Sequence, residues 1–429
     1  MRSHSSLARP MALALMAIGI VACMSTDTFA ANRTWTNASS SASGNRNKWG
    51  ITSQFATNWS GITNPTAADT AVFSGANGPS QTNTIMSNDT PIGSITFSGT
   101  TAYTFQKNST TGSLLISGNG SLPNVGIANN ASSRQTFDAG VKIGASNVQI
   151  SSSGAGSLKF TSMDLNGNRA TVDGAAEVVG LVGAVGSSYE AKGGAQSINF
   201  AAGSTVSTLV VSGGDVTSNG DSSLTDLDVT GGNYIGGGIF KTVDVTSGNL
   251  DLSGLALMST SATVGNTYSQ SGSGITKMDV SWDVLNSQTE FSTVNTNGGG
   301  FQLGGGLALD GTGLGALNFA YGTTWNLFQG VNFTAGAVSP ANDASNFSQF
   351  ALINAGSSPY DGTFTKFGQE WIGTTAADGT YLVFQAQTGN LVVVPEPSTM
   401  VFAGLGVAMS GWTMWKKRRL SKLLAAKAG

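Results

Sequence analysis

Three segments of the chain, TLVVSGGDV (208–216), DLDVTGGNY (226–234) and TVDVTSGNL (242–250), align with one another without a gap. Each is a short run of alternating apolar residues, followed by Ser or Thr, a Gly-containing turn, Asp or Asn and a further apolar residue. The distance along the chain from the start of the first segment to the start of the second is similar to the distance from the second to the third. A repeat this short cannot bury its own apolar face, whereas stacked repeats bury each other's. The pattern predicts a parallel β-helix, or β-solenoid.

The repeats also predict which side chains face inward and where the chain turns. Glycine adopts positive φ without steric cost and Asn and Asp tolerate it, so the Gly-Gly-Asp, Gly-Gly-Asn and Ser-Gly-Asn triplets are expected at the corners. A fourth, partial match, KMDVSWDVL, begins at Lys277, about two steps after the third repeat. The alternative fold is a β-sandwich, or a pair of them, because turns every 8 to 12 residues, roughly, suit it too. The predicted inward columns consist of Leu209, Val211, Leu227, Val229, Val243 and Val245.

The composition supports an all-β class. Charged residues make up 10% of the chain, against about 25% in typical soluble domains. The 59 Gly follow no Gly-X-Y period, which excludes collagen, and the 40% hydrophobic content argues against disorder. Abundant Gly, Ser, Thr and Asn beside Val, Ile and Phe indicate many short strands joined by tight turns.

The N-terminal segment 1–30 has the pattern of an export signal. Arg2 and Arg9 precede an apolar run over 11–21, and small residues allow cleavage between Ala30 and Ala31. We therefore predict a signal peptide over 1–30. The alternative is a loose lipobox, IVAC at 20–23, which would make Cys23 an acylated N-terminus.

Removal of this signal changes the chemistry of what remains. The single His, His4, and the single Cys, Cys23, both precede Ala31, and residues 31–394 hold 12 Lys and Arg against 21 Asp and Glu, a net charge of −9. Residues 31–394 therefore exclude Ser-His-Asp or Cys-His catalysis, His-ligated metals and disulfides. Their acidity argues against nucleic-acid binding. We predict that the protein is not an enzyme, with no catalytic residue, no cofactor and no nucleic-acid partner.

Aspartates are frequent around the repeats. We interpret them as turn residues, and no metal site is predicted, because their spacing matches neither an EF-hand nor the calcium-binding nonapeptide repeat. Calcium binding and a carboxylate pair acting on a sugar remain open. The aspartates concerned are Asp215, Asp221, Asp226, Asp228, Asp244 and Asp251.

The character of the sequence changes near Leu314, after which the apolar segments become longer and more aromatic. A stack of strands needs a cover over its last strand, because an open edge pairs with other chains. We therefore predict a β-solenoid ectodomain over 31–313 and a cap of antiparallel hairpins over 314–394.

The C-terminus predicts a membrane segment. Residues 400–415 carry no charge and as a helix would span about 24 Å, short of the hydrocarbon core of about 30 Å. Trp412 and Trp415 suit the membrane interface. A basic tail over 420–429 would then be cytoplasmic. The cations that would orient the helix are Lys416, Lys417, Arg418 and Arg419.

Pro395, Glu396 and Pro397, followed by a short apolar helix and a basic cluster, resemble the PEP-CTERM sorting signal over 395–419. The resemblance implies that an exosortase, a membrane-embedded transpeptidase-like enzyme, recognises Pro-Glu-Pro and cuts nearby. The tail beyond the cations is longer than is usual in the family. Exosortase and membrane lipid are therefore the expected partners.

The mature N-terminus resembles the Trp-rich opening of bacterial surface proteins built from autotransporter-type β-strand repeats. Trp49, Trp59, Pro65, Asp69 and Phe73 carry the resemblance. We expect Trp59 and Phe73 to plug the open end of a β core, and an aromatic platform for sugar rings is the alternative.

Together these features predict an exported, non-enzymatic structural or adhesion protein of the cell surface or extracellular matrix. It would be anchored transiently in the inner membrane and then released or transferred. The alternative is an extracellular carbohydrate-binding or polysaccharide-degrading β-helix, with polysaccharide as a further partner. Rows of exposed aromatics flanked by carboxylates on one face would favour the alternative, and a face of Ser, Thr and Asn would favour the structural role.

Overall fold

The computed structural model describes a chain built from strands. The described residues are 31–35, 48–49, 66–74, 80–85, 89–108, 112–120, 123–153, 155–218, 225–252, 261–283, 288–296, 300–316, 319–329, 347–356, 358–368, 370–385 and 388–396. Two large sheets consist mainly of parallel strands, and a third, smaller sheet is antiparallel. Among these residues the helical content is one short 3-10 turn, η2 (Thr312–Leu314). The predicted all-β class and its parallel pairing are confirmed.

The strands divide among the three sheets as follows. The first sheet contains β1 (Asn32–Thr34), β3 (Thr70–Phe73), β6 (Ser94–Phe97), β9 (Val125–Asn129), β12 (Val148–Ser152), β15 (Arg169–Gly174), β17 (Ser188–Gly193), β19 (Thr208–Val211), β21 (Asp226–Val229), β23 (Gly238–Val245), β25 (Ser261–Gln270), β28 (Thr293–Asn295), β29 (Gly300–Gln302) and β32 (Phe328–Gln329). The second contains β2 (Lys48–Trp49), β4 (Ser80–Ile85), β5 (Thr90–Ile92), β7 (Ala102–Lys107), β8 (Ser113–Ile116), β10 (Gln135–Phe137), β11 (Gly140–Ile143), β13 (Leu158–Phe160), β14 (Met163–Asp164), β16 (Ala176–Val182), β18 (Ala195–Phe200), β20 (Asp215–Ser218), β22 (Asn233–Ile235), β24 (Asn249–Asp251), β26 (Ile275–Asp283), β27 (Gln288–Phe291), β30 (Gly306–Asp310), β33 (Gln349–Ile353) and β34 (Gly362–Thr363). The third contains β31 (Thr324–Asn326), β35 (Thr365–Phe367), β36 (Glu370–Thr375), β37 (Thr380–Gln385) and β38 (Asn390–Pro395).

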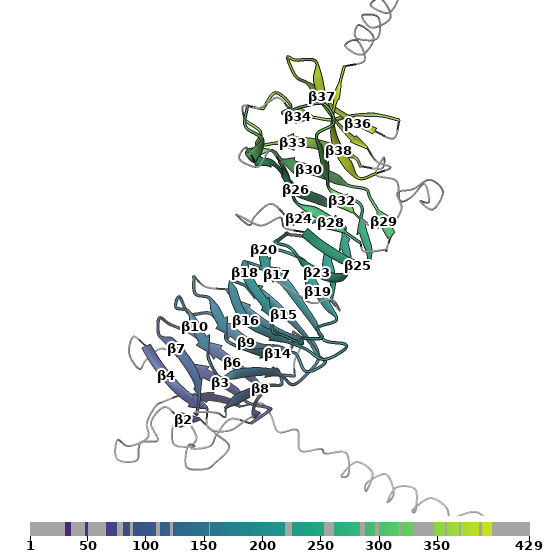
Figure 1. Cartoon of the computed structure of the whole chain (residues 1–429). Helices are drawn as coiled ribbons and strands as arrows, with labels where there is room; N and C mark the ends of the chain where they lie inside the picture. Colours follow the sequence, from purple (N-terminus) through teal and green to yellow (C-terminus); the bar gives the residue numbers. More distant parts are fainter. Residues whose placement is uncertain are drawn as a thin grey trace, which may run out of the picture.

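Over much of the chain, consecutive strands alternate between the two large sheets. From β19 to β24, for example, odd-numbered strands belong to the first sheet and even-numbered strands to the second. Each pairs in parallel with the equivalent strand one layer away, so that the layers stack along the long axis of an elongated body (Figure 1). Among the described strands of these two sheets, antiparallel pairing is confined to β26–β27 and β33–β34. The parallel ladders exclude the alternative of antiparallel sandwiches.

The gapless alignment of the three repeats is the register of the first sheet. Thr208 lies opposite Asp226, which lies opposite Thr242 in the next layer. The fourth predicted match was wrong, because Lys277 lies on β26 of the second sheet and pairs with Asp251. The first-sheet strand after β23 is β25. In the strands of both sheets, apolar residues that face one shared interior alternate with polar residues that face outward. The pattern alone therefore does not reveal the sheet to which a strand belongs.

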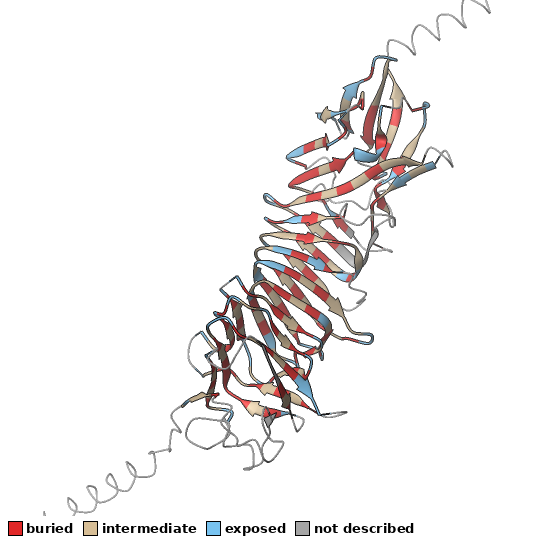
Figure 2. Ribbon diagram, turned by 90° about the vertical axis from the view of Figure 1, so that its left-hand side faces the viewer, coloured by how far each residue is buried: buried red, intermediate tan, exposed pale blue. Residues whose placement is uncertain are grey.

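The predicted inward columns form the core between the large sheets. The six residues of these columns are at most 1% exposed, and Figure 2 shows the buried positions alternating along the strands. Nearer the N-terminus the core is aromatic: the ring centroids of Phe105 and Phe137 lie 5.0 Å apart, and those of Phe137 and Phe160 lie 5.1 Å apart. These spacings approach the distance of about 4.8 Å between neighbouring strands, so each layer contributes one ring to the column.

The length of a layer varies strongly along the stack. In the first sheet Ile95 lies opposite Ile127, a step twice as long as that between Leu227 and its partner Val243. Earlier layers hold two second-sheet strands, as in β10 and β11, whereas later ones hold one, as in β20. The repeat is therefore visible in the sequence only where layers are short and of similar length.

The parallel ladders continue past the predicted boundary at 313. Leu352 of β33 lies opposite Leu309 of β30, and Phe328 of β32 lies opposite Val294 of β28, so strands of the segment 314–394 extend both large sheets. The antiparallel third sheet packs against the end of the stack, where the rings of Phe350 and Phe384 lie 5.3 Å apart. Figure 1 shows this sheet at the end of the body opposite β2 and β4.

Candidate functional site

The predicted sorting motif begins inside β38, the last strand among the described residues. Pro395 is the final residue of β38 and lies opposite Thr380 of β37. The amide of Glu396 then donates a hydrogen bond of 2.7 Å to the carbonyl oxygen of Gly379. Pro397, the predicted helix over 400–415, the basic cluster and the tail over 420–429 lie outside the described residues.

The local sequence explains why the strand ends here. In β38, Leu391 and Val393 are buried while Val392 and Val394 face outward, as expected for a half-buried strand. Proline has no N–H to donate to a ladder and is tolerated at strand ends, so Pro395 is compatible with the end of β38 but not with its interior.

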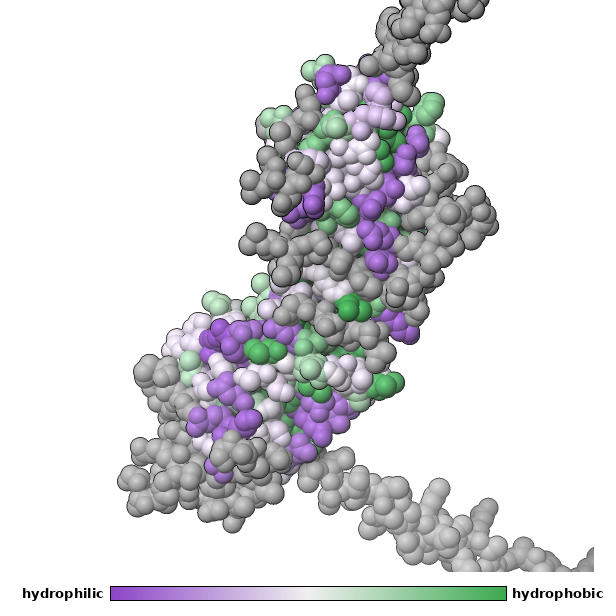
Figure 3. Space-filling view, in the orientation of Figure 1, coloured by the Kyte–Doolittle hydropathy of each residue, from purple (hydrophilic) through white to green (hydrophobic). Residues whose placement is uncertain are grey.

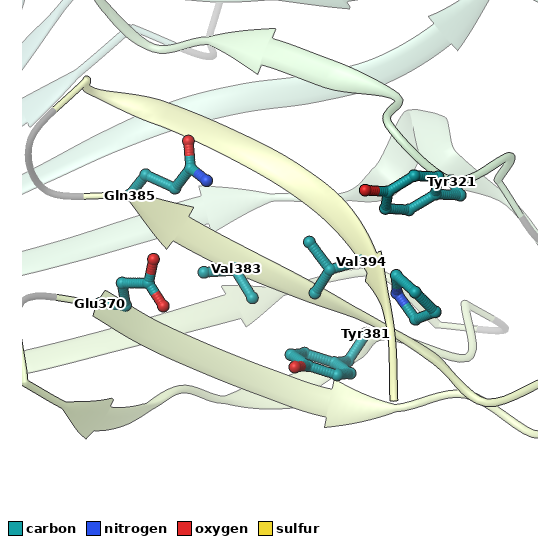
Figure 4. A pocket seen from close by; sticks show the side chains of 7 residues that line it. Tyr321, Glu370, Tyr381, Val383, Gln385 and Val394 are labelled. Carbon is teal, nitrogen blue, oxygen red and sulfur yellow. The ribbon is translucent and has the colours of Figure 1, made fainter. Parts of the chain in front are cut away.

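A groove of about 320 Å³ lies on the outer face of the third sheet, beside the start of the motif. Figure 4 shows Val383 and Val394 in the middle of the groove, Tyr321 and Tyr381 toward one end, and the polar Glu370 and Gln385 toward the other. Tyr321 is 69% exposed. The residues that line the groove are Tyr321, Glu370, Tyr381, Val383, Gln385, Val394 and Pro395. The groove was not predicted, because β36, β37, β38 and Tyr321 meet only in the folded sheet.

The predicted signal cleavage site leads directly into the fold. Ala30 is outside the described residues, but the backbone nitrogen of Ala31 donates a hydrogen bond of 3.0 Å to Oδ1 of Asp69. Asp69 is buried, and its Oδ2 accepts bonds from the backbone N and the Oγ1 of Thr66 at 2.9 and 3.0 Å. Arg33 Nε lies 3.8 Å from the same Oδ2.

The other positions of the N-terminal resemblance are described only in part. Phe73 is fully buried, with its ring centroid 5.8 Å from that of Trp35 and 5.3 Å from that of Phe97. It therefore lies in the core and not on a surface platform. Trp59 and Pro65 lie outside the described residues, and of Trp49 only the backbone is described.

The aspartates interpreted as turn residues lie instead on strands, at outward positions of β20, β21, β23 and β24, so the turn assignment was wrong. Asp221 lies outside the described residues. Asp215 Oδ1 accepts a bond of 2.6 Å from Asn233 Nδ2, and Asn233 Oδ1 accepts one of 2.7 Å from Asn249 Nδ2. Asp226 Oδ1 accepts a bond of 2.6 Å from Thr242 Oγ1. These side chains thus form ladders from layer to layer.

Unlike these hydrogen-bonded ladders, two carboxylates in adjacent layers of the first sheet repel each other. Asp228 lies opposite Asp244, and burial raises the pKa of Asp228, with further contributions from the charges of Asp244 and Asp226. Asp244 Oδ1 is buried without a hydrogen-bond partner among the described residues. This pair costs stability at neutral pH and adds no obvious chemistry.

A second charged cluster, on the second sheet, was missed by the sequence analysis. Lys277 Nζ lies 3.5 Å from Asp251 Oδ2 and 3.2 Å from Asp310 Oδ2. Burial raises the pKa of Asp279 to about 6, and the charge of Asp310 acts in the same direction. For Asp310, burial acts to raise the pKa, but hydrogen bonds from Thr312 and other neighbours lower it overall. These residues come together only through the parallel register, which no local motif signals.

The described part of the chain contains no group of three or more His, Cys, Asp or Glu that could hold a metal ion. Within the same residues, no helix is long and apolar enough to cross a membrane. The membrane helix predicted over 400–415 is not among the residues to which this finding applies.

Comparison with known proteins identifies one segment. Residues 393–419 match the family of the PEP-CTERM protein-sorting motif. This match supports an exported chain that is anchored in a membrane before an exosortase processes it. No curated protein and no solved structure matches the chain, so the resemblance to autotransporter-type repeats gains no support.

Proposed function

We propose that the protein is a non-enzymatic β-solenoid rod that serves a structural or adhesive role at the cell surface or in the extracellular matrix. An exosortase sorts the chain and removes its C-terminal segment. The observation that carries this proposal is the position of the sorting motif, which begins inside β38, the last strand that the structure describes.

The architecture supports the rod. Strands alternate between two parallel sheets that share one core, and each layer adds one strand to each ladder, as expected for a solenoid. Such a stack extends in one direction and needs covered ends, and the third sheet packs over one of them.

The surface supports a structural role over a glycan-binding one. Of the exposed large hydrophobic side chains in the described part, the aromatic ones are Tyr321 and Phe367, and neither lies on the two parallel sheets. The aromatic side chains of the stack point inward, for example Tyr103, Tyr189 and Tyr234. Hydrophilic and weakly polar residues cover much of the face in Figure 3, with hydrophobic residues scattered among them. The aromatic rows expected of a carbohydrate-binding face are therefore not found among the described residues of the stack.

The surroundings of the acidic side chains support the proposal that the protein is not an enzyme. Asp215 and Asp226 are held by neighbours in the next layer, and Glu190 accepts hydrogen bonds from Arg169, Thr171 and Ser212. Carboxylates tied into ladders act as rungs of the stack, whereas a general acid or base must reach a substrate.

Replacing Glu396 with Ala tests the sorting. Flanking prolines hold the Glu396 carboxylate on a stiff, extended segment, which suits it for recognition by a protease. We expect the Glu396→Ala protein to be exported and inserted but not cut, so that it accumulates in the membrane fraction with its tail attached. Intact-mass measurement of the membrane-bound and extracellular forms gives the result.

The matched control is Asp361→Ala, which removes an exposed carboxylate of the cap outside the groove and leaves the motif unchanged. It should be processed like wild type. Processing of Glu396→Ala at the wild-type rate, or extracellular protein that still carries residues 412–420, would reject the sorting role.

A further inference from the structure

The start of the sorting motif is part of the folded body. The matched segment begins at Val393, its residues 393–395 are paired with β37 in the third sheet, and Glu396 N adds one further backbone bond. The backbone N and O of Val393 bond to Thr323 O and Gly322 N, both at 2.9 Å. Beyond Val393 the pairing that remains is with β37, and it ends with the bond from Glu396 N to Gly379 O. The groove shows that the side-chain face at Val394 and Pro395 is open although the backbone is paired.

The turn that holds Glu396 is itself firmly built. Asp378 Oδ1 accepts hydrogen bonds from the N and the Oγ1 of Thr380, at 3.0 and 2.6 Å. Gly379 has a φ of 78°, and its N bonds to Ala376 O at 3.0 Å. Thr380 Oγ1 also lies 2.8 Å from the hydroxyl of the fully buried Tyr360. Glu396 is therefore connected through this turn to the core of the cap.

A protease binds its substrate as an accessible, extended chain, and cleavage of a folded segment depends on how often that segment opens. Three residues, 397–399, separate Glu396 from the predicted membrane helix. They span about 11 Å at most when extended, so an enzyme in the membrane cannot bind the motif without meeting the cap.

We propose that the turn over 376–380 is a clamp that restrains processing. The exosortase takes up Pro-Glu-Pro only after the last rung, Thr380 opposite Pro395 and the bond from Glu396 to Gly379, has opened. Asp378 and Thr380 act through the turn and set the rate of this opening. The inference rests on the processing proposed above and adds a determinant outside the matched motif.

Two variants loosen the clamp without changing the motif. Asp378→Ala removes the acceptor of both hydrogen bonds that order the turn and should speed tail removal by at least about fivefold, the factor that corresponds to the loss of one hydrogen bond. Insertion of Gly-Ser-Gly-Ser between Val394 and Pro395 moves the intact motif out of the sheet and should speed it about tenfold or more. Pulse-chase labelling with intact-mass detection measures the rate, and amide exchange at Glu396 should rise with it in the Asp378→Ala protein.

The matched control is Asp138→Ala. Asp138 is also an exposed aspartate that accepts a threonine hydroxyl bond, from Thr161 at 3.0 Å, but it lies in the stack. It should leave both the rate and the exchange unchanged. If the two loosened proteins are cut at the wild-type rate or more slowly, the clamp is refuted. If wild type itself is never cut, the failure lies with the proposed processing.

The N-terminus carries a second, independent inference. Asp69 is buried: its Oδ1 accepts a bond from the backbone N of Ala31, while its Oδ2 accepts bonds from Thr66 and lies 3.8 Å from the charged Arg33 Nε. Ala31 is also tied to the first sheet, because its carbonyl accepts a bond of 3.0 Å from Thr70 N.

We propose that Asp69 is the receptor for the new N-terminus that signal cleavage creates. Water hydrolyses the Ala30–Ala31 bond in the signal peptidase, Ala30 leaves as a carboxylate, and the amine of Ala31 takes up a proton. The hydrogen bond thereby becomes an ion pair.

A double-mutant cycle tests whether Asp69 binds the new N-terminus. One extra Gly between Ala30 and Ala31, left on the mature chain, moves the ammonium away from Asp69 and should raise the unfolding equilibrium constant about tenfold. The same Gly in an Asp69→Asn background should have little effect. An α-amino group has an ordinary pKa near 8, and an adjacent carboxylate raises it, so the stabilisation should be complete below about pH 8 and lost as the pH rises through the raised folded-state pKa. Equal effects of the Gly in both backgrounds, or a mature chain that begins at Cys23 by intact mass, would overturn the proposal.

Discussion

Replacing Val229 with Asp should unfold the middle of the stack. Val229 is fully buried and lies between Val211 and Val245 in the inward column. The new carboxylate would be desolvated among apolar side chains without a partner, at a cost of about 3–5 kcal/mol. We expect a large fall in the free energy of unfolding in urea titrations, followed by circular dichroism.

The neighbouring change Asp228→Ala is the control, because this side chain points out of the stack. The folded-state pKa of Asp228 is raised, so its ionisation destabilises the fold above that pKa and has no effect below the unfolded value of about 3.8. The variant should therefore equal wild type in acid and match or slightly exceed its stability at pH 7. Equal losses in Val229→Asp and Asp228→Ala would contradict the assigned facing of the strand.

Gly232→Ala should be the second severe change, because this corner has no room for a side chain. Gly232 has a φ of 72°, and an added Cβ would lie 2.4 Å from the carbonyl oxygen of Gly214 in the adjacent layer. The strained φ costs about 1 kcal/mol, and the clash with backbone adds to it by forcing two layers apart. We expect a loss of about 3 kcal/mol or more in the free energy of unfolding.

Gly203→Ala separates the cost of the strained φ from the cost of the backbone clash. Gly203 has a φ of 75°, but no atom lies within 4 Å of the position that an added Cβ would take, so only the φ strain remains. Its loss should be about 1 kcal/mol in the same urea titration. If both glycines tolerate Ala equally well, close stacking of the corners does not determine the stability of this region.

Much of the stack could be predicted locally, and the errors have a common cause. The alignment of Thr208, Asp226 and Thr242 gave the register because short layers of similar length place equivalent residues at similar steps. Lys277 was assigned to the wrong sheet because strands of both sheets carry the same alternation. Where the layers lengthen, as between Ile95 and Ile127, turns of variable length hide the repeat.

Buried polar residues show where prediction from sequence ends. Gln135 is fully buried, and its Oε1 accepts a bond of 2.8 Å from Tyr103 N in the layer below. Gln270 likewise donates to the carbonyl of Gly306 in the next layer at 2.6 Å. Nothing in the neighbouring residues distinguishes these glutamines from exposed ones, because Tyr103 and Gly306 lie in other layers.

By itself the sequence determined the all-β class, the inward columns of the repeats and the sorting motif, since each depends on residues close together in the chain. Only the tertiary structure decided which strands share a sheet and brought Lys277 to Asp310 and Asp69 to Ala31. It also placed Glu396 against Gly379. These contacts join residues that lie far apart in the chain, and the lengths of the intervening turns, which no periodicity encodes, determine whether they meet.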